Sequence, residues 1–130
     1  MIDAQAVINY LVSKGLSFTT IDHAWTMEPV DKLDVPTPML LVYPGQVGAQ
    51  PSQFALRVIQ DGSEQTVFLI ICKSAELKSL EEELRLAFLG YEMSEHHSGM
   101  EFVGGAPEGI RGQYIWWKCT FQTQLQYRAI

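Results

Sequence analysis

The sequence contains little cysteine and lacks any long apolar run. Its two cysteines, Cys72 and Cys119, are too few for a disulfide framework, and both lie in apolar, strand-like stretches. We therefore expect buried free thiols in a reducing compartment. No stretch approaches the ~20 apolar residues needed to span a bilayer, and the first residues lack the basic start and apolar stretch of a signal peptide. These absences predict a cytosolic domain with no membrane partner.

Basic residues are also scarce. Nine Lys and Arg stand against fifteen Asp and Glu, for a net charge of −6, which argues against a protein whose task is to neutralise nucleic-acid phosphates. The acidic excess lies within residues 61–101, which hold nine acids and three bases. Such a run is most often a solvated helix face. The alternative is a surface that repels nucleic acid or meets a basic partner.

The composition is otherwise globular, with 47% hydrophobic and 18% charged residues in 130, which predicts a single domain over 1–130. Apolar residues recur at helical spacing over 3–14, where Asp3 is placed to cap the helix and Gly15 to end it. A short strand is expected near 18–21.

Residues 22–38 contain three prolines, which exclude a regular helix. We expect an extended arm at about 22–38. An irregular segment of this length in a compact domain is usually functional or contacts another molecule.

The middle of the chain is predicted to form strands. Residues 39–43 are a short apolar strand, and 44–53 are a polar loop with glycine and proline. Residues 54–60 alternate between apolar and polar, 61–63 (Asp-Gly-Ser) predict a turn, and 65–72 are apolar on both faces. This pattern predicts a hairpin of 54–60 with 65–72, whose second strand is central in the sheet.

A second helix is predicted from Ser74, as its cap, to about residue 89, with Gly90 after its end. Residues 100–103 are a short strand, and the glycine-rich stretch 104–112 is expected to be a flexible connection. Residues 114–127 carry the longest strand signal, with an apolar face at the odd positions and a polar face at the even ones. The order of elements predicts an α+β fold, a largely antiparallel sheet of four to five strands with two helices packed on one side.

No catalytic, cofactor or metal constellation is evident in the sequence. His23 stands apart, and His96 and His97 are adjacent, which does not favour one shared metal. Cys72 lies in a predicted strand without an obvious base. The glutamates 81–83 are consecutive on a helix and therefore splay by about 100°. The sequence thus predicts a protein that is not an enzyme and needs no cofactor.

One tryptophan lies on the polar face of the last strand. Trp116 shares that face with Lys118, Thr120 and three glutamines. It either covers an element of its own domain or anchors a partner, since aromatic residues are enriched in interface cores. The row of uncharged threonine and glutamine side chains beside it is either the face of a plain solvated strand or a surface covered by another protein. The candidate interface residues are Trp25, Arg111, Trp116, Lys118, Gln122 and Gln124.

The second half of the chain carries a pattern of packing residues and turn glycines. Its parts are Leu84-Arg85-x-Ala87-Phe88-x-Gly90, Met100-Glu-Phe-Val-Gly-Gly105, Gly112, Trp116-Trp117, Phe121 and Tyr127-Arg128. Over residues 77–128 this pattern resembles the small tail terminator (tail completion) proteins of long-tailed bacteriophages.

The resemblance implies a non-enzymatic virion protein with a sheet flanked by helices. Such proteins form a hexameric ring at the head-proximal end of the tail, stop tube polymerisation and join the neck; in contractile tails they also meet the last sheath ring. The implied partners are other copies of the chain, the tail tube and sheath proteins, and a neck or head-completion protein. DNA only passes through the channel, and the virion is assembled in the bacterial host cytoplasm.

A ring around a DNA channel gains from a lumen that repels phosphate. We therefore hypothesise that part of the acidic segment faces the channel, with the candidate residues Glu81, Glu82, Glu83, Glu92 and Glu95. A closed ring needs two different contact patches, and the arm at 22–38 and the last strand are candidates for them.

Two other interpretations stay open at this point. The chain is alternatively another small head–tail connector, neck or baseplate protein, which sequence separates poorly from a terminator. Failing that, it is a cytosolic protein-binding α+β module. An enzyme would need a titratable pair formed by folding, such as His23 with a carboxylate from 92–101.

Overall fold

The computed structural model describes residues 1–24, 36–52 and 57–129. In this part of the chain two helices and five strands follow one another in the order α1 (Ala4–Ser13), β1 (Thr20–His23), β2 (Met39–Ala49), β3 (Ile59–Lys73), α2 (Ser74–Phe88), β4 (Glu101–Arg111) and β5 (Tyr114–Arg128). They build one sheet in the strand order β1-β2-β3-β5-β4. Only the β1–β2 pair is parallel among the described strands. The predicted α+β fold with a largely antiparallel sheet is confirmed.

Both helices begin with a side chain that accepts a backbone hydrogen bond. The Asp3 carboxylate accepts from the Ala6 N–H at 3.2 Å, as predicted. The expected cap of α2 is wrong, because Ser74 is already helical and Lys73 is the N-cap residue. There the Glu76 side chain accepts from the Lys73 N–H at 3.2 Å. A glycine at positive φ, Gly90 in the case of α2, follows each helix.

The main core lies between both helices and one face of the sheet. Three phenylalanines meet there edge to face: Phe88 of α2 has ring centroids 5.0 Å from Phe68 of β3 and 5.1 Å from Phe121 of β5. Val7 and Leu11 of α1 join the same buried cluster. β3 lies between β2 and β5, so the predicted central strand is confirmed. Its apolar half is buried on both faces, because alternate side chains enter two different hydrophobic clusters.

The predicted turn at 61–63 is wrong, because β3 passes straight through it. Gly62 pairs with Ala49 of β2 on one side and with Leu125 of β5 on the other. A Cβ at Gly62 would lie 2.1 Å from Cε2 of Tyr127. Glycine is therefore needed here because the Tyr127 ring packs on the backbone, and not because the chain turns. The hairpin joins β2 to β3, and most of the expected loop at 44–53 is strand.

The predicted flexible connection at 104–112 is also wrong. It forms most of β4, which pairs with β5 along its whole length. A Cβ at Gly105 would lie 2.8 Å from the indole nitrogen of Trp117, so this glycine makes room for the ring. Two register shifts, at 102–104 and 107–109, let the glycine- and proline-rich strand follow its partner.

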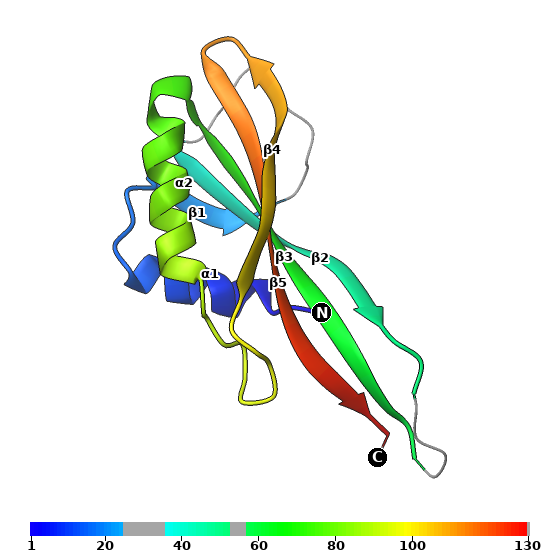
Figure 1. Cartoon of the computed structure of the whole chain (residues 1–130). Helices are drawn as coiled ribbons and strands as arrows, with labels where there is room; N and C mark the ends of the chain where they lie inside the picture. Colours follow the sequence, from blue (N-terminus) through cyan, green and yellow to red (C-terminus); the bar gives the residue numbers. More distant parts are fainter. Residues whose placement is uncertain (25–35, 53–56, 130) are drawn as a thin grey trace.

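Three strands continue together beyond the helices, as Figure 1 shows. We call this projection the blade, made of residues 44–49 of β2, 59–64 of β3 and 123–128 of β5. The carbonyl of Val58 accepts a hydrogen bond from the Ala129 N–H at 3.1 Å near its end. The β4–β5 hairpin projects at the opposite end of the molecule (Figure 1).

Candidate assembly surfaces

The face of the sheet away from the helices carries a second, smaller core. Trp116 is 2% exposed and packs with Leu41, Leu69 and Ile71 of the neighbouring strands. Of the two alternatives for Trp116, this packing favours the one in which the ring covers part of its own domain, and a contact with a partner stays a prediction. Burial of this ring makes it a determinant of the domain's stability and leaves little of it to contact a partner.

Two polar atoms are buried beside this second core. Among the described residues, neither the Trp116 indole nitrogen nor the Tyr43 hydroxyl has a hydrogen-bond partner. Burial, with the nearby Glu108 carboxylate as the second cause, raises the pKa of Tyr43 to about 12. The neutral phenol is thus the form that this face accommodates.

The same face becomes polar toward the blade. Gln65 donates from its side-chain amide to the Gln122 side-chain oxygen at 3.3 Å, and the Lys118 ammonium lies 3.8 Å from the Glu108 carboxylate. Where this face reaches the blade there is a shallow hollow of about 390 Å³. It is lined by Gly48, Ala49, Gln50, Asp61, Gly62, Ser63, Gln122 and Gln124. The predicted contact residues Lys118, Gln122 and Gln124 lie along this strip, and their contacts stay a prediction.

The two remaining candidate contact residues are placed differently. Arg111 is exposed at the end of β4, next to the turn into β5 and far from the blade. Trp25 and most of the predicted arm lie outside the described residues.

The five candidate channel-facing acids do not form one cluster. Glu81 pairs with Arg85 at 3.0 Å, and Glu83 accepts from the Ser17 N–H and hydroxyl, each at 3.1 Å, which ties α2 to the segment after α1. Glu82 is exposed on the outer side of α2, and Glu92 and Glu95 lie on the following loop. Their role in a channel remains a prediction.

A buried carboxylate that the sequence analysis did not single out lies at the base of the blade. Glu64 is 4% exposed and accepts hydrogen bonds from the Met1 ammonium at 2.7 Å, the Tyr127 hydroxyl at 2.8 Å and the His97 Nε2 at 3.2 Å. Burial alone raises the pKa of Glu64, but these hydrogen bonds and the ammonium charge outweigh burial, and the pKa is lowered overall. A lone carboxylate in the inward register of a strand was the available signal.

His97 fastens a loop to the sheet. Its Nδ1 lies 2.7 Å from the Ser94 hydroxyl while Nε2 contacts Glu64. The next residue, Ser98, donates its backbone N–H to the Gln124 carbonyl at 2.8 Å, and its hydroxyl oxygen accepts from the Gln124 N–H at 2.9 Å. The loop therefore extends the pairing along the edge of β5. A hollow of about 950 Å³ lies between this loop and the blade.

The described residues contain no group of three or more potential metal ligands. The cysteines are buried free thiols, as predicted, and burial raises the pKa of Cys72 to about 11 and that of Cys119 to about 12. Such thiols are poor nucleophiles at neutral pH. Neither described helix is long and apolar enough to cross a membrane.

No protein-family model and no curated protein sequence matches the chain. The fold, however, is similar to that of a chain in the virion of a native gene transfer agent (GTA) particle. The two chains superpose with a TM-score of 0.55 at 15% sequence identity, over 94% of this chain and 86% of the other. At this identity the similarity shows a shared fold that extends over nearly the whole domain.

Proposed function

We propose that this protein is a structural, non-enzymatic component of a phage-like virion. The observation that carries the proposal is the fold shared with a gene transfer agent virion chain over 94% of the sequence. Within that class we propose a tail terminator, which closes the head-proximal end of a tail as a ring of six copies and joins it to the neck.

Several of the residues that carry the resemblance to tail terminators pack together, and this supports the finer assignment. Phe88 of α2 lies against Phe121 of β5. The Arg85 guanidinium lies 5.2 Å from the centroid of the Phe102 ring on β4, and Gly90 donates its N–H to the Met100 carbonyl at 2.8 Å. This part of the pattern thus corresponds to α2 packed on β4 and β5.

The charge of the chain also fits a ring that lets DNA pass. A net charge of −6 gives a channel wall no general attraction for phosphate. The proposed partners are other copies of the chain, the tube protein, a sheath protein in a contractile tail, and a neck or head-completion protein, in a virion assembled in the host cytoplasm.

Capping of growing tubes tests this proposal. Purified protein is added to tail tube protein that polymerises from baseplates, and the tubes are examined by electron microscopy. We expect a ring of six copies at the end distal to the baseplate and an arrest of elongation. Binding at the baseplate end, or to an isolated neck without any effect on elongation, would instead indicate another connector, neck or baseplate role. Binding to none of these would leave a protein-binding module unrelated to virions.

A further inference from the structure

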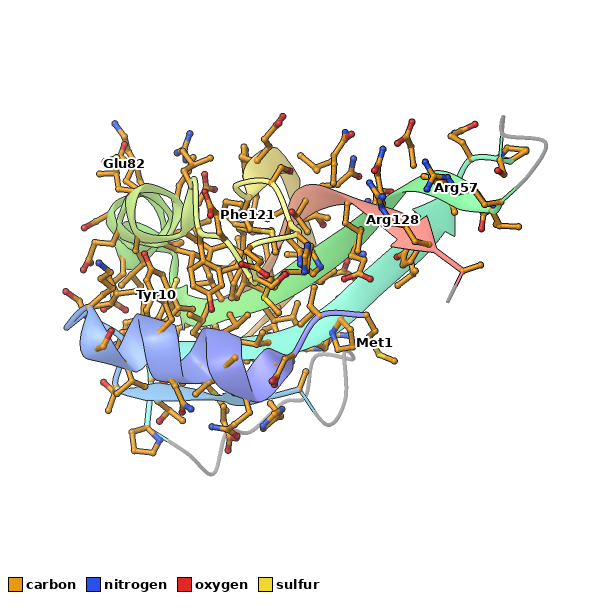
Figure 2. The ribbon with its side chains drawn as sticks, turned by 90° about the horizontal axis from the view of Figure 1, so that it is seen from below. Met1, Tyr10, Arg57, Glu82, Phe121 and Arg128 are labelled. Atoms are coloured by element: carbon orange, nitrogen blue, oxygen red, sulfur yellow. The ribbon has the colours of Figure 1, made fainter. Side chains whose placement is uncertain are left out.

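The free end of the blade carries positive charge and an exposed apolar side chain. Arg57 is the only charged residue of the sequence between positions 43 and 60, and Arg128 is the only one after Lys118. Figure 2 shows both arginines at the projecting end of the molecule. Val58, next to Arg57, is 50% exposed. We call Arg57, Val58 and Arg128 the blade tip.

The outer side of α2 carries the complementary features. Leu86 is 81% exposed and Leu89 is 45% exposed, and Glu82 is exposed one helical turn before Leu86. A spacing of four residues places Glu82 and Leu86 on one stripe of α2, and Leu89 follows as the C-cap residue three positions after Leu86. We call Glu82, Leu86 and Leu89 the α2 stripe. Acids outnumber bases in this part of the sequence, where residues 74–101 hold seven acids and two bases.

The blade tip and the α2 stripe cannot meet within one molecule. Figure 2 shows Glu82 at one end of the molecule and Arg57 at the other. Figure 1 likewise shows α2 far from the end of the blade. Each surface pairs a charge with an exposed aliphatic side chain, and the charges have opposite sign. Such surfaces are complementary between two copies of the same chain.

We propose that the blade tip of one copy docks on the α2 stripe of a second copy. Arg57 and Arg128 then face Glu82, while Val58 is buried against Leu86 and Leu89. The contact is heterologous, because two different surfaces meet, and repeated head-to-tail contacts close into a ring when the rotation between copies allows it. The inference deepens the proposed terminator function, which requires a ring.

Disulfide trapping between two variants tests the contact directly. Val58→Cys and Leu86→Cys are purified separately, one of them isotopically labelled, and are then mixed and mildly oxidised. The native thiols do not interfere, because Cys72 and Cys119 are both 0% exposed. We expect a disulfide-linked product with one labelled and one unlabelled copy, at least tenfold more abundant than the linked product of either variant alone.

A matched control uses Ile110→Cys in place of Val58→Cys. Ile110 is 64% exposed on β4, near the end of the molecule opposite the blade (Figure 1). We expect the mixture of Ile110→Cys with Leu86→Cys to give no more product than random collision. An equal yield from the control, a predominant product between two Leu86→Cys copies, or no mixed product would each overturn the contact.

The tube-capping assay separates this inference from the proposed function. Variants that cap tubes without forming the mixed disulfide would show a terminator that assembles through other surfaces. Mixed disulfides from a protein that does not cap tubes would establish the contact between copies and would contradict the terminator role.

Discussion

The ring of Tyr127 lies across the backbone of Gly62, and its hydroxyl donates to the Glu64 carboxylate at 2.8 Å. One side chain of β5 thereby joins two positions of β3 at the base of the blade. The blade has no helix packed on it and is a narrow ribbon that needs such ties.

Gly62→Ala should destabilise the domain by about 1–3 kcal/mol, because the added methyl would overlap the Tyr127 ring and displace its hydroxyl from Glu64. Gly48→Ala is the matched control on the adjacent strand, where a Cβ would come no nearer than 3.8 Å to the Ser63 hydroxyl. Urea unfolding of both variants checks the prediction. Equal stability of the two variants would show that the ring over Gly62 can move without loss.

Tyr127→Phe keeps the ring and removes only its hydrogen bond. Because the acceptor is a charged, buried carboxylate, we expect a loss of about 1.5–3 kcal/mol at neutral pH. Burial and the hydrogen bond to Glu64 raise the pKa of Tyr127 to about 12. A raised pKa favours the neutral phenol in the folded state, so this stabilisation is complete below the unfolded pKa near 10 and is lost as the pH rises toward 12. Tyr127→Phe should therefore lose less stability than the wild type between pH 9 and 11, as measured by urea unfolding.

Glu64→Gln should alter the acid side of the stability profile. The pKa of Glu64 is lowered in the folded protein, so its carboxylate contributes stability above the unfolded value of about 4.5, and this contribution is lost as the pH falls through the folded pKa. Thermal unfolding at a series of pH values from 7 to 3 should show a smaller acid-induced fall in Tm for Glu64→Gln than for the wild type. Glu82→Gln, on the exposed side of α2, should keep the wild-type profile.

Trp116→Ala should destabilise the folded monomer by about 3–5 kcal/mol, since the ring is 2% exposed and fills the core of the helix-free face. If Trp116 were instead an anchor for a partner, the other alternative that the sequence left open, the variant would be a folded monomer that assembles poorly. Ile110→Ala removes an exposed apolar side chain from the neighbouring strand and should change stability by less than about 0.5 kcal/mol. Circular dichroism during urea unfolding distinguishes the two outcomes. A Trp116→Ala protein of wild-type stability would show that the second core contributes little.

Local pattern predicted the elements whose determinants lie close together in the sequence. The spacing of Val7 and Leu11 predicted α1, and the alternation through Phe121 predicted β5 and its inward face. The burial of Trp116 could not be predicted in this way. Its neighbours along β5 are polar, whereas the residues that pack on it, such as Leu41 and Ile71, lie on other strands. The sequence of β5 alone therefore does not indicate those contacts.

Glycine caused two further errors, for a related reason. At Gly62 and Gly105 the residue leaves space for a ring that is distant in the sequence, Tyr127 in one case and Trp117 in the other. Local pattern treats both as turn or loop signals. Glu64 was missed because His97 and Tyr127 reach it only in the folded chain.

Leu86→Ser should weaken assembly without weakening the fold. The side chain is 81% exposed in the monomer, so the free energy of unfolding should change by less than about 0.5 kcal/mol. At the proposed contact, however, the loss of its burial costs about 1.5–3 kcal/mol per site. This corresponds to a roughly tenfold to hundredfold lower association constant. Sedimentation velocity over a concentration series measures this effect. Val12→Ser is the matched control on α1, where the side chain is 60% exposed and lies in neither proposed surface. An equal effect of both substitutions would point to nonspecific association of apolar side chains. A selective effect of Leu86→Ser, together with weaker wild-type association at high salt, is what docking of a basic blade tip on an acidic helix requires.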